Sequence, residues 1–276
     1  MLTKEAEILY LFAKEPWRKY NFTELRKASG KRSRSYLAGV LGKLAAAGLL
    51  KRELFGRLPL YSLDPASMKA RVFAGFVLEN FGWGKRRVPY ADLQKLMDRM
   101  PYRDYVFLVT GSYASGKQTE RSDIDVIVLI GDTARPKRVY AELSHYCELN
   151  IPPVHLYVFR HGEFVKMLCD REGNYGKEAA KNSLCLTGGQ VYVGLLQEAV
   201  SDRLRTDRVG IFMSGGLDSP SLAATARDLL NVGGAPDAVQ AFTLVYDTLI
   251  PDSERRYAGM AARHLGIPIH YYALDN

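Results

Sequence analysis

Apolar residues recur at helical spacing at the start of the chain and then give way to shorter runs. A stripe over residues 8–12 predicts a first helix. Asn21 followed by Glu24 has the spacing of a capping box and predicts a second, short helix. A third stripe over 36–44 is followed by two apolar runs within 49–63, which predict a hairpin. Three helices and a hairpin are therefore expected near the N-terminus.

The pattern changes twice further along the chain. Residues 66–100 predict two helices, and apolar strands separated by polar loops follow at Tyr105–Thr110, Val126–Ile130 and Val154–Phe159. From Arg208 onward, short strands alternate with helices, with the strands at 208–213, 239–246 and 267–272 and the helices at Ser221–Leu230 and Ser253–Leu265. This alternation predicts parallel βαβ units with a ligand at the carboxyl ends of the strands.

Charge divides the chain in the same way. Residues 1–65 hold 13 Lys and Arg against 6 Asp and Glu, whereas residues 196–276 hold 7 against 10. Every basic residue after Lys181, apart from histidine, is arginine, which predicts a boundary between Lys181 and Asp202. We therefore expect three units: an N-terminal unit (1–65), a middle unit with a helical lead-in (66–195) and a C-terminal unit (196–276).

Composition excludes several classes of protein. With 25% charged and 47% hydrophobic residues, the chain has a globular composition and is not expected to be disordered. It has no run of 18 apolar residues, and Met1–Glu5 lacks the features of a signal peptide. Cys147, Cys169 and Cys185 form no CxxC pair and cannot build a disulfide framework. A cytoplasmic protein with no membrane contact is expected.

The cations of the N-terminal unit lie on elements that could meet a polyanion. Three helices followed by a hairpin resemble a winged helix-turn-helix, in which the third helix reads DNA and the hairpin is the wing. The candidate nucleic-acid-binding residues on these elements are Lys31, Arg32, Arg34, Lys43 and Arg57. Double-stranded DNA is the expected partner, with an affinity that falls steeply with salt. The alternative is a winged helix used for dimerisation or for contact between domains.

The middle unit carries a motif suited to nucleotidyl transfer. Gly111 and Ser112 follow the first strand, where the glycine allows close approach of a triphosphate and the serine can donate a hydrogen bond to it. Asp123 and Asp125 are two residues apart at the next strand, so both carboxylates face one side and can share divalent metals. Two metals can activate the attacking oxygen and neutralise the pyrophosphate that leaves.

This stretch, over roughly residues 100–190, resembles the DNA polymerase beta-like nucleotidyltransferase superfamily. It is similar in particular to minimal prokaryotic members and to the nucleotidyltransferase halves of toxin–antitoxin pairs. The resemblance implies that Asp123 and Asp125 are the catalytic metal ligands. Active members usually carry a third carboxylate on a later strand, but His155 stands at that place here. Histidine suits Mn²⁺ or Zn²⁺ better than Mg²⁺, so both an active enzyme and a nucleotide-binding domain without turnover stay open.

The C-terminal unit begins with a strand that runs directly into Ser-Gly-Gly-Leu-Asp-Ser. The free N–H groups of such a turn and the dipole of the following helix together form an anion site. Asp218 is suited to hold Mg²⁺ on released pyrophosphate. The candidate nucleotide-binding residues of this loop are Ser214, Gly215, Gly216, Leu217, Asp218 and Ser219.

The hexapeptide is identified as the PP-loop of ATP pyrophosphatases, and residues 196–276 look like the synthetase domain of asparagine synthetases. That resemblance implies an adenine nucleotide alpha hydrolase-like fold, adenylation of a carboxylate by ATP and attack by an amine. It further implies that the main chain near Thr243 and Leu244 holds the adenine. The sequence stops at Asn276 after about three strands, so we expect an incomplete domain that a partner subunit could complete.

The fold expected for the whole chain is multidomain, α+β and α/β. It would comprise an N-terminal winged helix, a polymerase beta-like nucleotidyltransferase and a partial parallel-sheet PP-loop unit. The favoured function is an ATP-using, Mg²⁺- or Mn²⁺-dependent nucleotidyltransferase with a DNA-binding winged helix and an ATP-binding module. One alternative is a carboxylate-adenylating, amide-forming enzyme or a fragment of one. Another is a DNA-binding transcriptional regulator that senses nucleotide without turnover. The sequence does not identify the acceptor.

Overall fold

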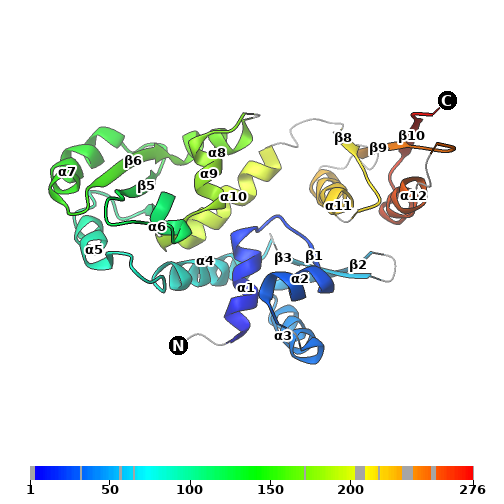
Figure 1. Cartoon of the computed structure of the whole chain (residues 1–276), viewed down its shortest axis with the longest axis horizontal. Helices are drawn as coiled ribbons and strands as arrows, with labels where there is room; N and C mark the ends of the chain where they lie inside the picture. Colours follow the sequence, from blue (N-terminus) through cyan, green and yellow to red (C-terminus); the bar gives the residue numbers. More distant parts are fainter. Residues whose placement is uncertain are drawn as a thin grey trace.

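The structure is a computed structural model, and it describes residues 4–31, 33–55, 58–64, 66–170, 172–202, 209–216, 218–231, 239–249 and 253–275. These residues form a mixed α/β protein with two three-stranded sheets and one four-stranded sheet. Strands β5 (Ile124–Ile130) and β6 (Val154–Arg160) lie at one end of the molecule and β8 (Val209–Phe212) at the other (Figure 1). The elements of residues 4–63 lie below and between them.

The N-terminal unit contains the helices and the hairpin that its pattern predicts. The helices are α1 (Lys4–Lys14), α2 (Phe22–Ser29) and α3 (Arg34–Ala46), and the strands β1 (Tyr20–Asn21), β3 (Leu58–Leu63) and β2 (Leu50–Phe55) pair in that order, antiparallel. The capping box at Asn21 and Glu24 is confirmed, since the Asn21 side chain accepts from the Glu24 N–H and the Glu24 carboxylate accepts from the Asn21 N–H. A short first strand, β1, is added to the predicted hairpin.

The N-terminal and middle units share one continuous hydrophobic core. Helix α4 (Met68–Gly82) packs between α1 and α10 (Gly189–Asp202), and Ala74 and Val77 are buried there. The helices approach so closely that a Cβ at Gly75 would lie 2.2 Å from the backbone nitrogen of Gln190. Helix α10 runs across the expected boundary between residues 195 and 196, and it packs on α4 and α8 (His161–Cys169).

The four-stranded sheet of the middle unit carries the predicted motif residues where β4 ends and β5 begins. Its strand order is β6-β5-β4-β7, with β4 at Tyr105–Val109 and β7 at Leu184–Thr187, and only β5 and β6 run parallel among these four. One face packs against α5 (Tyr90–Asp98) and α7 (Pro136–Leu149), and the other against α8, α9 (Tyr175–Lys181) and α10. The short helix α6 (Gly111–Ser115) follows β4 directly.

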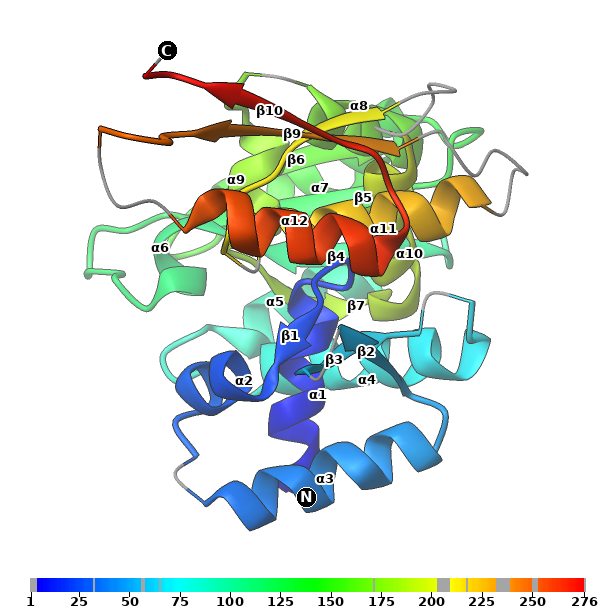
Figure 2. The same ribbon diagram turned by 90° about the vertical axis from the view of Figure 1, so that its right-hand side faces the viewer.

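The C-terminal unit has the predicted parallel βαβ arrangement. Its strand order is β10-β9-β8, with β9 at Val239–Val245 and β10 at Ile269–Ala273. Helices α11 (Asp218–Asn231) and α12 (Glu254–Leu265) lie side by side beneath the sheet (Figure 2) and build a separate core rich in alanine. Helix α11 begins at Asp218, three residues before the predicted start, so the Asp218 carboxylate lies in its first turn.

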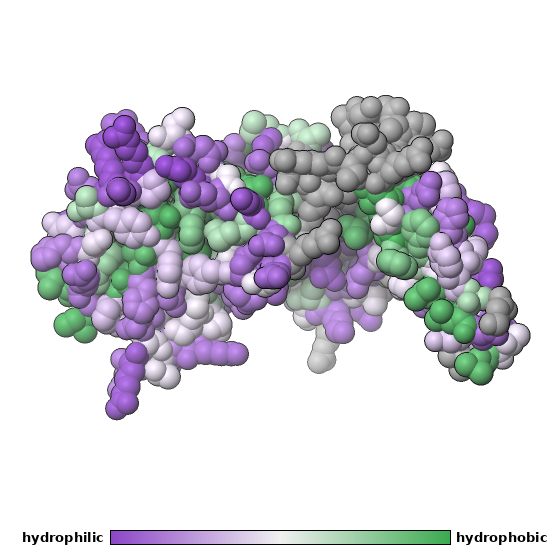
Figure 3. All heavy atoms as spheres, turned by 90° about the horizontal axis from the view of Figure 1, so that it is seen from above, coloured by the Kyte–Doolittle hydropathy of each residue, from purple (hydrophilic) through white to green (hydrophobic). Residues whose placement is uncertain are grey.

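The opposite face of this sheet carries exposed apolar side chains among the described residues. Phe212 is 74% exposed, Tyr272 53% and Leu244 50%, and the Phe242 ring stacks on those of His270 and Tyr272. Viewed from above, apolar residues are visible at this end of the molecule (Figure 3). Parallel sheets are usually covered on both faces, whereas these apolar side chains are exposed.

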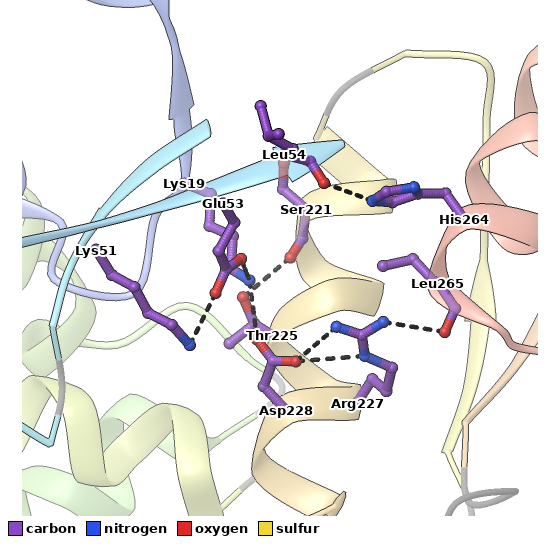
Figure 4. A network of polar contacts seen from close by, with 10 residues as sticks. All are labelled: Lys19, Lys51, Glu53, Leu54, Ser221, Thr225, Arg227, Asp228, His264 and Leu265. Carbon is purple, nitrogen blue, oxygen red and sulfur yellow. Dashed lines mark hydrogen bonds and ion pairs between the residues drawn. The ribbon is translucent and has the colours of Figure 1, made fainter. Parts of the chain in front are cut away.

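The C-terminal unit docks on the N-terminal unit through polar contacts (Figure 4). Lys19 is 7% exposed, and its Nζ lies 2.7 Å from Glu53 on β2 and 3.1 Å from Asp228 on α11. The Nε2 atom of His264 on α12 lies 2.5 Å from the carbonyl oxygen of Leu54. The predicted wing is thus held by the C-terminal unit. No helix in the described ranges is long and apolar enough to span a bilayer.

Candidate functional site

The two carboxylates of the predicted motif share a neighbour. Asp125 on β5 stands opposite His155 on the parallel strand β6. The His155 Nδ1 atom lies 3.6 Å from Asp125 Oδ1, and its Nε2 atom lies 3.5 Å from Asp123 Oδ2. The three side chains are 53%, 29% and 41% exposed, for His155, Asp125 and Asp123 respectively, so a ligand from solvent can reach them. His155 therefore lies beside both aspartates, and its role as a third ligand stays a prediction.

Gly111 is required by both its conformation and its surroundings. Its φ is +65°, in the left-handed region, and a Cβ there would lie 2.2 Å from Asp125 Oδ2. The backbone of the Gly111–Ser112 turn thus passes directly over one carboxylate. A phosphate bound to this turn would lie next to Asp125, which is the juxtaposition that nucleotidyl transfer requires.

Two tyrosines that the sequence reasoning did not select border the same site. The rings of Tyr157 on β6 and Tyr175 at the start of α9 are 4.6 Å apart between centroids. The Tyr175 hydroxyl lies 3.1 Å from Oγ1 of Thr110, the residue before Gly111. Burial raises the pKa of the Tyr175 hydroxyl. Strand alternation could have indicated Tyr157, which is two residues after His155, but Tyr175 comes from a separate helix.

The donor set fits a divalent cation bound partly by substrate. In the part of the chain that the structure describes, no group of three or more His, Cys, Asp or Glu side chains is arranged to hold a metal ion. Mg²⁺ is commonly held by one or two carboxylates together with substrate phosphates and water. Asp123 and Asp125 offer two such carboxylates beside the Gly111 turn. They suit Mg²⁺ when substrate phosphates supply the remaining ligands.

The predicted phosphate-binding loop of the C-terminal unit, at Ser214–Ser219, has hydrogen bonds within the chain. The Ser219 hydroxyl accepts a hydrogen bond of 2.8 Å from the Ser214 N–H and lies 3.1 Å from the Ser214 hydroxyl. The N–H of Gly215 donates to the carboxylate of Glu254 at the start of α12. A carboxylate of the chain itself thus lies on an amide that was expected to bind phosphate. Gly216 is exposed, and Leu217 lies outside the described residues.

Asp218 faces the other units as well as the loop. It lines a cavity of about 1140 Å³, together with side chains of the N-terminal and middle units such as Trp17 and Leu196. Of the predicted adenine-binding segment, Thr243 is 2% exposed and its hydroxyl donates to the Met213 carbonyl, whereas Leu244 is half exposed. The Thr243 side chain therefore has a structural hydrogen bond. Adenine binding was predicted for the main chain near Thr243, and that stays a prediction.

The predicted nucleic-acid-binding cations are mostly engaged within the chain. Lys31 Nζ lies 2.5 Å from Glu7, and Lys43 Nζ lies 3.2 Å from Glu5, so two of them pair with acids of α1. Arg34 lies over the ring of Phe22, with its Cζ atom 5.6 Å from the ring centroid. Arg32 and Arg57 fall outside the described residues. DNA binding stays a prediction.

Comparison with known families matches two of the three units. Residues 93–174 match the family model of a nucleotidyltransferase domain. This segment contains Gly111, both aspartates and His155, and the match supports an enzyme of nucleotide transfer. Residues 192–276 match the family model of asparagine synthase, which supports the predicted resemblance of the C-terminal unit.

One curated relative and one solved structure each match part of the chain. The chain is similar to amidase chyE from Penicillium rubens, with 35% identity over 89 residues, which is 29% of this chain. The matched segment spans 13% of that relative's length. A solved structure, described as the crystal structure of the toxin-antitoxin with AMP-PNP, aligns at 21% identity and a TM-score of 0.30. That alignment covers 42% of this chain and 86% of the other.

Proposed function

We propose that the middle unit transfers a nucleotidyl group from ATP to an acceptor. The observation that carries the proposal is the placement of Asp123 and Asp125, both within 3.6 Å of the His155 ring, beside the Gly111 turn. The match of residues 93–174 to a nucleotidyltransferase domain supports it. The reaction joins an acceptor oxygen to the α-phosphorus and breaks the bond to the β-phosphate, so that pyrophosphate leaves.

Each residue has a distinct task in this reaction. The Gly111–Ser112 turn binds the β- and γ-phosphates through backbone N–H groups and the serine hydroxyl. Asp123 and Asp125 hold the divalent cation, which neutralises charge on the phosphates when it is bound. The His155 ring, within 3.6 Å of each carboxylate, keeps the two aspartates oriented toward the substrate.

The C-terminal unit is proposed to bind ATP through the pyrophosphate moiety. The turn at Ser214–Gly216 ahead of α11 and the match to asparagine synthase support this role. An amide-forming synthetase is the second candidate function, since that family match favours it. The exposed sheet face over Phe212 and Tyr272 would then be where a polypeptide completing the pocket docks.

Duplex DNA is the proposed partner of the N-terminal unit. The basic excess of residues 1–65 and the exposed N-terminus of α3 support it. Because Lys31 and Lys43 already pair with acids of α1, we propose that phosphates must compete with these ion pairs. Binding is therefore expected to be weak and to depend strongly on salt.

The experiment that tests the first proposal follows pyrophosphate release and transfer of label from α-³²P-ATP, with Mg²⁺ or Mn²⁺. The wild type is compared with the double variant Asp123→Ala, Asp125→Ala and with Asp218→Ala. Release lost only in the double variant supports the middle unit as the enzyme. Release lost only in Asp218→Ala supports the synthetase. Full transfer by the double variant overturns the proposal.

A further inference from the structure

The carboxylate site is bordered on one side by an aromatic surface. Side chains alternate along β6, so Tyr157 lies on the same face as His155, two residues or about 7 Å further along the strand. The neighbouring residues Val154 and Val158 are buried on the other face, which confirms this alternation. Tyr157 is 38% exposed, so part of this residue is accessible from solvent.

The second ring of this surface is firmly held. Asn174 caps α9, accepting from the Lys177 N–H at 3.1 Å, and its amide donates to the Met167 carbonyl at 2.7 Å. These bonds fix the first residue of the helix, Tyr175, whose hydroxyl lies 3.1 Å from Thr110 Oγ1. Thr110 is 2% exposed and is bound to the backbone of Asp125. Through Thr110, Tyr175 is thus linked both to the Gly111 turn and to the backbone of Asp125.

We propose that Tyr157, supported by Tyr175, is the surface on which the nucleobase of the substrate stacks. This inference rests on the proposed nucleotidyl transfer and identifies where the base lies in that reaction. A nucleotide with its phosphates on the Gly111 turn and its α-phosphate at Asp125 extends its ribose and base away from the carboxylates. Tyr157 is the exposed aromatic ring on that face of β6.

Stacking of this kind determines which substrates are preferred. Every base has a π face, so an aromatic surface accepts all of them, and the larger purines gain more contact area than pyrimidines. The rings at this surface offer no array of hydrogen-bond donors and acceptors for the edge of a base. Similar KM values for ATP and GTP, and higher values for CTP and UTP, are expected.

The proposal is tested by kinetics and by photolabelling of the full chain. Tyr157→Ala should raise the KM for ATP about tenfold with little change in kcat, which corresponds to the loss of one stacked ring. Tyr157→Phe should keep the wild-type KM, because the ring is retained. Tyr146→Ala serves as a matched control, since Tyr146 is 45% exposed on α7, beyond the opposite face of the sheet.

A second measurement locates the base directly. After irradiation with 8-azido-ATP, peptide mapping should find label on the peptides that contain Tyr157 or Tyr175. Label on other segments of the middle unit, or an unchanged KM in Tyr157→Ala, overturns the base surface. The proposed nucleotidyl transfer stands even when the base surface is overturned, provided that the double variant of Asp123 and Asp125 loses transfer. A wild type with neither transfer nor labelling of the middle unit overturns both.

Discussion

The Nζ atom of Lys19 lies 3.1 Å from Oδ2 of Asp228, a residue 209 positions later in the chain. This contact joins the loop before β1 to helix α11 across the interface between the N-terminal and C-terminal units. Lys19 is 7% exposed and also bonds to Glu53 on β2. A buried ammonium with two carboxylate partners makes the docking of the C-terminal unit sensitive to the loss of either carboxylate.

Acid is expected to release this docking. Burial opposes ionisation of Asp228, but hydrogen bonds from Arg227 and the charge of Lys19 outweigh it and hold the pKa of its carboxyl below the ordinary range. The pKa of Glu53 is likewise lowered against burial by Lys19 and Lys51. Lys19 belongs to the other unit, so its share in lowering the pKa of Asp228 stabilises the docked state at pH values above the ordinary carboxyl pKa. That contribution is lost as pH falls through the lowered pKa of Asp228, below about pH 4.

At neutral pH the same effect should follow from Asp228→Asn, which removes one charge and weakens docking by about 1 kcal/mol. Small-angle scattering should then give a larger radius of gyration than the wild type. Asp247→Asn is the control, because Asp247 pairs with Arg255 inside the C-terminal unit, at 2.6 Å. Equal compactness of Asp228→Asn and wild type at neutral pH would show that Lys19 does not hold the interface.

Gly111→Ala should abolish transfer while the protein stays folded. The added Cβ would lie 2.2 Å from Asp125 Oδ2, so the carboxylate or the turn must move, and a loss of at least about 100-fold in kcat/KM is expected. Gly116→Ala is a matched control, since Gly116 also has a positive φ, +72°, but no atom of the described residues lies within 4 Å of its Cβ position. Both variants carry about 1 kcal/mol of left-handed strain. If both lose activity equally, strain and not contact with Asp125 is responsible.

His155→Asp should shift the metal preference toward Mg²⁺. The substitution places a third carboxylate opposite Asp125, where imidazole now lies 3.6 Å from Oδ1, and so adds an oxygen ligand of the kind that Mg²⁺ prefers. The ratio of transfer rates in Mg²⁺ and Mn²⁺ is the measurement, and a several-fold rise is expected. His145→Asp, on an exposed position of α7, controls for the change of charge. An unchanged ratio would place His155 outside the metal site.

Local patterns predicted much of this fold because they are set by neighbouring residues. The capping box at Asn21 and the alternation of strands and helices after residue 208 depend on patterns within a few positions. The pairing of Asp125 with His155 was anticipated from the motif, although the two residues are 30 positions apart. The resemblance to a known family therefore predicted a tertiary contact that the local sequence pattern alone does not predict.

Contacts between distant segments were not predictable in the same way. Tyr175 reaches Thr110 from a separate helix, and Glu254 reaches Gly215 from the start of α12. Neither residue has a local signal, because tyrosine at a helix start and glutamate in a first turn are ordinary features. The shared core of α1, α4 and α10 was also not predicted, because an apolar stripe indicates that a helix face is buried but not which helix packs against it.

The N-terminal unit should bind duplex DNA only at low salt. Arg34→Ala should weaken binding several-fold, whereas Glu5→Gln should strengthen it, because Lys43 is then released from its ion pair of 3.2 Å. Fluorescence anisotropy with labelled duplex between 50 and 200 mM salt measures both. Glu178→Gln, in the middle unit, is the control for net charge. Binding that does not change in either variant would exclude α3 as the contact.

The phosphate loop of the C-terminal unit should bind pyrophosphate more tightly in Glu254→Gln. The Glu254 carboxylate accepts the Gly215 N–H, so it competes with an incoming phosphate for that donor and repels its charge. The neutral amide competes less, and a gain of about 1 kcal/mol, or roughly fivefold in Kd, is expected.

Calorimetry with pyrophosphate and Mg²⁺ measures this change. Asp92→Asn removes the same charge on α5, which lies at the opposite end of the molecule from α11 and α12 (Figure 1), and controls for the overall potential of the protein. Weaker binding in Glu254→Gln would mean that the carboxylate shapes the loop for its ligand and does not occupy its place. In that case Glu254 belongs to the binding site, and the contact with Gly215 holds the loop in its binding conformation.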